Sequence, residues 1–134
     1  MRNNIESSVR RRLVQGRLDD IRKHIVRFIY SYDRLAKLSY EKIKKSSDLR
    51  WLYEREYENA VYIRDTLIMI AHLLEGIKKD LQDNTTTLEK LEKLEKILTS
   101  LIYNTKSLPD ELVFRINELR GVLSDLLEGK LFRV

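Results

Sequence analysis

An apolar stripe in the middle of the chain constrains its fold more than any other feature. Between residues 60 and 81 the aliphatic residues recur at steps of three and four, at Ala60, Ile63, Leu67, Ile70, Leu74, Ile77 and Leu81. This is the a/d spacing with which one helix packs against a partner helix. After residue 84 the stripe resumes with Leu88, Leu91, Leu94, Leu98 and Leu101. It predicts a long helix that needs an equally long helix to cover it.

The segment before the stripe is the one candidate long enough to cover it. It carries apolar residues at the same spacing, namely Leu18, Ile21, Ile25, Phe28, Tyr32 and Leu35, and then Ala36, Tyr40 and Ile43. Ser46, Ser47 and Asp48 follow and favour an N-cap for the next helix. So short a break predicts antiparallel neighbours. The hairpin core that we expect consists of Leu18, Ile21, Ile25, Phe28, Ala60, Ile63, Leu67, Ile70, Leu74 and Ile77.

The last third of the chain contains two segments that predict helix boundaries. The polar run at 83–87 either ends the second helix or is spanned by it. After a loop at 104–107, Pro109 opens a last helix with Asp110 and Glu111 in its first turn, and Gly129 ends it. The expected fold is all-α, an elongated antiparallel hairpin of two long helices plus one or two shorter C-terminal helices. We divide the chain into a short basic amphipathic segment (1–16), a helical core (17–128) and a tail (129–134).

Composition argues against several classes of function. The 134 residues suggest one domain, and the absence of cysteine excludes disulfides and thiolate zinc sites. His24 and His72 have no second histidine at helical spacing, and HExxH, glycine-rich phosphate loops and GxSxG are absent. There is neither a transmembrane run nor a signal peptide. We therefore expect a cytoplasmic protein without enzymatic activity, metal or cofactor.

Positive charge is concentrated in the first third of the chain. Residues 1–46 carry 13 Lys/Arg against 5 Asp/Glu, and the remainder carries 13 against 16. Ile5, Val9 and Leu13 share one helical face beside Arg10, Arg11, Arg12 and Arg17. Such a basic amphipathic helix is typical of a membrane interface. Two other interpretations stay open: that these are the opening turns of the first long helix, and that a basic helix lies on an acidic one.

Two short motifs, together with the overall helical pattern, resemble features of a known protein family. Residues 57–60 (Tyr-Glu-Asn-Ala) lead into Ile63 and Arg64, and the last helix opens with residues 108–111 (Leu-Pro-Asp-Glu). With the basic first helix and the long seam, these features resemble the ESCRT-III proteins, most nearly the archaeal cell-division members. The likeness spans about residues 15–128 and is strongest over residues 38–67.

This resemblance implies a filament-forming scaffold at the membrane periphery that acts in remodelling or scission, in cell division or budding. Its partners would be copies of itself and related paralogues, an anionic membrane and an AAA ATPase, although we identify no ATPase-binding segment before Val134. The basic residues carried over as membrane-binding are Arg10, Arg11, Arg12, Arg17, Arg22, Lys23 and Arg27. The alternatives are a basic helical nucleic-acid-binding protein of the chromatin type and a coiled-coil adaptor. The former lacks a recognition motif and an aromatic platform.

Overall fold

The computed structural model describes residues 2–46, 48–83, 85 and 88–129, with side chains from residue 9 onward. The described chain forms four helices, α1 (Arg2–Lys45), α2 (Arg50–Gln82), α3 (Leu88–Asn104) and α4 (Asp110–Leu127). The all-α class and the two long helices are thereby confirmed. The tail predicted at 129–134 lies outside the described residues except for Gly129.

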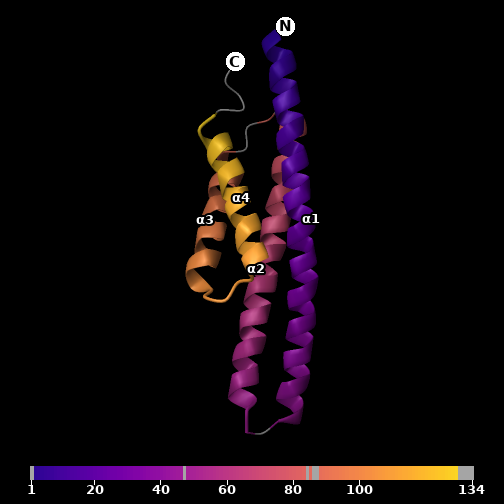
Figure 1. The fold of residues 1–134 in the computed structure, drawn as a ribbon, viewed down its shortest axis with the longest axis vertical. Helices are drawn as coiled ribbons and strands as arrows, with labels where there is room; N and C mark the ends of the chain where they lie inside the picture. The colour runs from indigo at the N-terminus through magenta and orange to yellow at the C-terminus, as the bar shows by residue number, and fades with distance from the viewer. Residues whose placement is uncertain (1, 47, 84, 86–87, 130–134) are drawn as a thin grey trace.

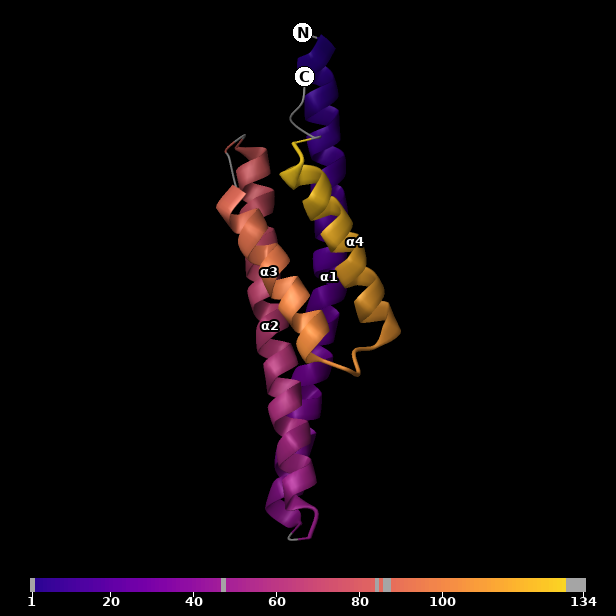
Figure 2. The same cartoon turned by 90° about the vertical axis from the view of Figure 1, so that its left-hand side faces the viewer.

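The four helices are arranged as a ring in which each helix packs against the next one in the chain and α4 packs against α1. Figure 1 shows that α3 and α4 cover only the half of α1 and α2 that lies nearer the N-terminus. Figure 2 shows α3 beside α2 and α4 beside α1. Beyond Tyr62, whose hydroxyl lies 3.4 Å from Asn104 Nδ2 at the end of α3, the remaining 12 residues of each long helix (34–45 of α1 and 50–61 of α2) project as a two-helix arm. The molecule is thus a four-helix bundle at one end and a helix pair at the other.

The register of α1 on α2 follows from contacts in which residues with higher numbers in α1 pair with residues with lower numbers in α2. These contacts are Asp19–Lys78, Arg22–Glu75, Asp33–Arg64 and the ring pair Tyr40–Tyr57. The two helices therefore run antiparallel. At this register, the first turns of α1 extend beyond Gln82, the last residue of α2.

The core follows the apolar stripes. Of the ten residues expected in the α1–α2 core, Phe28 is partly buried and the others are at most 1% exposed. The α3 seam (Leu91, Leu94, Leu98 and Leu101) and the inner face of α4 (Leu112, Ile116, Leu119, Val122, Leu123 and Leu126) complete it. In the arm the core narrows to the small residues Ala36, Ser39 and Ala60, all buried. Leu35, Tyr40 and Leu88, expected in the stripes, are instead exposed.

The helix ends decide one open question and correct one expectation. From Arg2 onward the basic amphipathic segment forms the opening turns of the first long helix, because α1 continues through Gly16 to Lys45. The expected Ser or Asp cap of α2 is wrong, because α2 begins after Leu49, which makes no side-chain cap bond. Ser46 Oγ instead accepts a hydrogen bond from the Leu49 N–H at 3.3 Å. At the end of α4, Gly129 adopts a φ of 73°, the left-handed conformation that favours glycine after a helix.

Candidate functional site on the outer face of α1

Four exposed cations line up along the side of α1 that faces away from the core. Arg12, Lys23, Arg27 and Arg34 are separated by 11, 4 and 7 residues, which keeps them on one face of a helix with 3.6 residues per turn. They span about 33 Å of helix axis. In the described part of the chain, none of the four takes part in an ion pair. We call these four residues the basic stripe.

The described acidic side chains of α1 that precede the arm lie beside the neighbouring helices. Each forms an ion pair with a cation of another helix: Asp19 with Lys78 at 2.8 Å, Asp20 with Arg115 at 3.5 Å and Asp33 with Arg64 at 2.9 Å. Carboxylates near the basic stripe would otherwise cancel its field. Their pairing across helix interfaces leaves the outer face of α1 with uncompensated positive charge.

Hydrogen bonds to two of these carboxylates shift the pKa of a group in each pair. Lys37 Nζ lies 2.9 Å from Asp33 Oδ2, and Arg64 Nη1 donates to the other oxygen at 2.9 Å. Both cations lower the pKa of Asp33 and keep it ionised, Lys37 more than Arg64. The hydrogen bond to Asp19 likewise raises the pKa of Lys78. Each shift favours the charged form, so these pairs persist across the neutral pH range.

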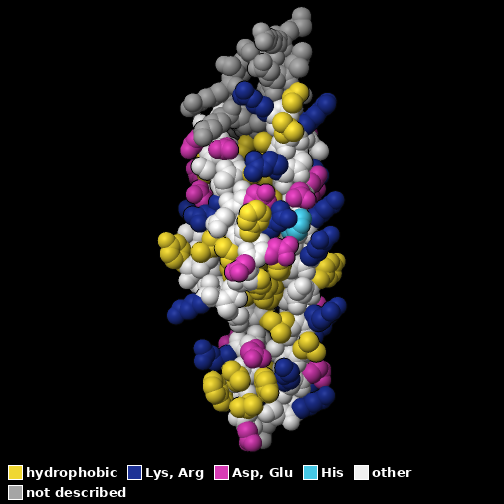
Figure 3. Space-filling model, in the orientation of Figure 1, with side chains coloured by type: hydrophobic (Ala, Val, Ile, Leu, Met, Phe, Trp, Pro, Cys, Tyr) yellow, Lys and Arg dark blue, Asp and Glu magenta, His cyan; other side chains and the backbone are white. Residues whose placement is uncertain are grey.

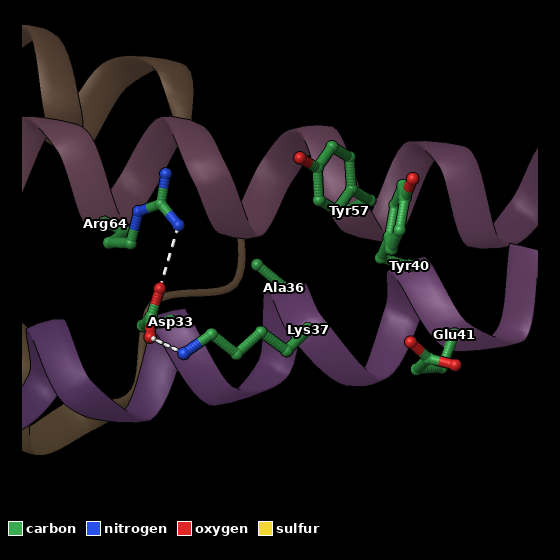
Figure 4. Close-up of a pocket in the computed structure, with 7 residues that line it drawn as sticks. All are labelled: Asp33, Ala36, Lys37, Tyr40, Glu41, Tyr57 and Arg64. Atoms are coloured by element: carbon green, nitrogen blue, oxygen red, sulfur yellow. Dashed lines mark hydrogen bonds and ion pairs between the residues drawn. The ribbon is translucent and has the colours of Figure 1, made fainter.

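A shallow cavity of about 350 Å³ lies beside the Asp33 pair, between α1 and α2. Figure 4 shows its lining residues, Asp33, Ala36, Lys37, Tyr40, Glu41, Tyr57 and Arg64. The Tyr40 and Tyr57 rings pack with centroids 5.8 Å apart. Asp33 is held by two cations, and Glu41 lies 3.8 Å from Lys44. Because the charges are satisfied within the protein, we assign this cavity to the packing of α1 on α2.

The residues expected at the membrane fall into three groups. Val9 and Leu13 are 50% and 65% exposed on the turns of α1 that extend past α2, and the side chain of Ile5 lies outside the described residues. The exposed basic residues are Arg10, Arg12, Arg17, Lys23 and Arg27. Arg11 is half-buried and makes an interaction within the structure.

Arg22 does not belong with the outward-facing cations. Its Nε lies 3.4 Å from Glu75 Oε2 at the interface of α1 and α2, and we therefore assign this residue to helix packing. Arg34, by contrast, belongs to the basic stripe but was absent from the residues that we expected at the membrane. The spacing of 7 from Arg27 and 11 from Lys23 is the sequence signal that would have found it.

His24 connects α1 to α4. Its Nδ1 lies 2.8 Å from the carbonyl oxygen of Asp20, and its Nε2 lies 2.9 Å from Arg115 Nη2. Because Arg115 can only donate, Nε2 is placed to accept from it and Nδ1 to donate to the Asp20 carbonyl oxygen. His72 is exposed on α2. Among the residues that the structure describes, no group of three or more His, Cys, Asp or Glu side chains could hold a metal ion.

Comparison with known proteins gives no further guide to this site. No family model, curated protein or solved structure matches the chain. Within the described helices, none is both long enough and apolar enough to cross a membrane. The charge and shape of α1 and its neighbours are therefore the features from which a function can be inferred.

Proposed function

We propose that this protein is a filament-forming, membrane-associated scaffold of the ESCRT-III type that acts in membrane remodelling or scission. In this proposal the basic stripe binds an anionic membrane, and α1 with α2 forms the elongated hairpin that repeats along a filament. Copies of the chain or related paralogues assemble at the cytoplasmic face, and an AAA ATPase takes them apart. The protein works by binding and polymerising, without catalysis.

The separation of charge on α1 carries this proposal. The described acids before the arm pair with neighbouring helices, and the cations of the basic stripe face outward. Each basic residue near an anionic membrane surface contributes about 1 kcal/mol, so four together contribute about 4 kcal/mol. That is roughly a thousandfold in the binding constant, the difference between marginal and stable adsorption. Val9 and Leu13 would add a smaller apolar contribution that does not depend on salt.

The folded-back position of α3 and α4 supports assembly through opening at residues 83–87. The α3 seam is buried, with Leu94, Leu98 and Leu101 at 0% exposure, and it packs against α2 and α4. Opening at 83–87 would expose this seam together with the face of α2 that it covers. Each opened copy could then cover the seam of the next copy, and such an open-ended exchange converts a monomer contact into a filament contact.

Liposome co-sedimentation tests the membrane part of the proposal. The variant Arg12→Gln, Lys23→Gln, Arg27→Gln, Arg34→Gln removes the basic stripe, and its affinity for phosphatidylserine vesicles should fall by about three orders of magnitude. A matched control removes four exposed cations elsewhere, with Lys93→Gln, Lys96→Gln, Lys106→Gln and Arg120→Gln. Equal losses in both variants would show that net charge alone drives binding, and the stripe would have no special role.

A second pair of substitutions is needed to separate a membrane from nucleic acid, because a straight row of cations also suits a phosphate backbone. Nucleic-acid binding depends steeply on the logarithm of salt concentration, whereas inserted aliphatic side chains leave a salt-resistant remainder. Val9→Asp together with Leu13→Asp should abolish that remainder on vesicles. The contrary result, in a mobility-shift assay, is that the protein binds duplex DNA more strongly than vesicles and that these two substitutions have no effect. That result would identify nucleic acid, and not a membrane, as the partner.

A further inference from the structure

The turn between α1 and α2 exposes large apolar side chains at the end of the molecule farthest from the N-terminus. Leu49, Trp51 and Leu52 are 46%, 59% and 36% exposed. They follow one another across the turn and the first residues of α2, and the turn is the most projecting point of the arm (Figure 1). Figure 3 shows hydrophobic side chains gathered near this end, with Lys and Arg as well as Asp and Glu side chains around them. We call these three residues the tip patch.

Basic residues surround the tip patch. Lys42, Lys44 and Lys45 lie in the last turn of α1, and Arg50 begins α2. Arg50 pairs with Glu54 at 2.9 Å and Lys44 lies 3.8 Å from Glu41, so residues 41–54 carry four Lys/Arg against three Asp/Glu. Lys42 and Lys44 lie over the rings of Tyr53 and Tyr40 at 5.4 and 4.5 Å. These contacts hold the ammonium groups beside the aromatic side chains. The end of the arm therefore combines exposed apolar surface with a net positive charge.

From this arrangement we propose that the tip patch is a second membrane contact, which enters the interface of an anionic bilayer. Tryptophan concentrates at the membrane interface, where its apolar ring and its polar N–H are both accommodated. Lysines extend from such a site to the headgroups and are attracted by anionic lipid. The proposal takes from the proposed function only its partner, an anionic membrane, and it does not require the basic stripe.

The tip patch and the basic stripe face different directions. Trp51 precedes Glu58 by 7 residues, and both are exposed on one face of α2. Further along this face, Tyr62 and Met69 line a groove against α3. The side chains of α2 that reach α1 are on another face, as the ion pairs of Arg64, Glu75 and Lys78 show. A membrane lying flat on the basic stripe would leave Trp51 in water. Contact through the tip patch would bury it.

Because Trp51 is the only tryptophan, its fluorescence reports this contact directly. The full chain is mixed with phosphatidylcholine vesicles that contain or lack phosphatidylserine, and sedimentation and Trp51 emission are measured on the same samples. We expect emission to shift to shorter wavelength with the anionic vesicles and to be quenched by brominated lipid. Leu49→Ser with Leu52→Ser should remove the shift and weaken vesicle binding by about tenfold, while the exposed positions keep the fold intact.

A control variant with Met69→Ser and Phe114→Ser removes two exposed apolar side chains far from the turn and should behave as the wild type. Sedimentation with unchanged Trp51 emission would overturn the tip contact and leave the proposed function standing. An emission shift that persists in the variant lacking the basic stripe would support membrane contact by the tip patch. It would also show that this contact does not need the basic stripe. An equal shift at high protein concentration without vesicles would assign the tip patch to a second copy of the chain and overturn the proposal.

Discussion

We expect Leu67→Ala to lower the free energy of unfolding by about 3–4 kcal/mol. Leu67 lies in the middle of the α2 stripe and is 0% exposed. The substitution deletes three carbon atoms, worth about 0.8 kcal/mol each when fully buried. The cavity left in a four-helix cross-section that cannot collapse completely adds to this loss, and measured Leu→Ala costs range over about 2–5 kcal/mol. For a chain of this length the midpoint of thermal unfolding should fall by about 10 °C.

Urea and thermal unfolding followed by helical circular dichroism measure this effect. Met69→Ala is the matched control, because Met69 lies two residues further along the same helix and is 48% exposed. Its cost should remain within about 0.5 kcal/mol. Equal destabilisation by the two substitutions would refute the assignment of the stripe to the core. An unchanged urea slope in both variants would show that the comparison refers to the same unfolding transition.

Two further predictions concern the Asp33 pair and the segment at 83–87. Since the pKa of Asp33 is lowered in the folded state, its stabilisation is present above the unfolded pKa of about 3.9 and is lost as pH falls through the folded value. Asp33→Asn should therefore destabilise the protein at pH 7, and urea midpoints of the two proteins should converge in strong acid; a constant difference would contradict the pairing. Spin labels at Glu58 and Lys106 should report a short distance in the monomer, because Asn104 Nδ2 lies 3.4 Å from the Tyr62 hydroxyl. In assemblies the distance should approach about 72 Å if α2 and α3 form one rod, and an unchanged distance would exclude opening at this segment.

The sequence predicted the all-α class and the long helices because the α2 stripe is aliphatic throughout. It misplaced residues where burial depends on the extent of a neighbouring helix. Leu35 fits the α1 stripe, but it is 43% exposed in the arm, where α1 packs against α2 alone. Ser39 is 1% exposed although it is polar, because a small side chain fits between closely packed helices. Neither effect is visible in a hydropathy pattern, which is local, whereas the length of the covering helices is a tertiary property.

The candidate site, like the fold, could be predicted only in part from the sequence. The excess of Lys and Arg in the first third can be read from the sequence, but the separation of charge on α1 cannot. Asp19 pairs with Lys78, and Asp33 pairs with Arg64, 31 residues away. Only the register of α1 on α2 shows which acids are neutralised across an interface. For the same reason the sequence assigned Arg22 to the membrane face, although Glu75 holds it at the interface.

Because α3 and α4 are shorter than α1 and α2, the four-helix bundle and the two-helix arm differ in their resistance to local unfolding. In the bundle, each helix contributes to a core that two neighbours enclose, so a residue cannot lose its protection without disturbing several helices. In the arm, the fully buried residues are the small Ala36, Ser39 and Ala60, and the larger Tyr40 and Tyr57 rings pack at its partly exposed edge. Segments with little buried apolar surface open at lower free energy than the rest of a protein. We therefore expect amide hydrogens near the turn to exchange through separations of the helix pair that leave the bundle folded.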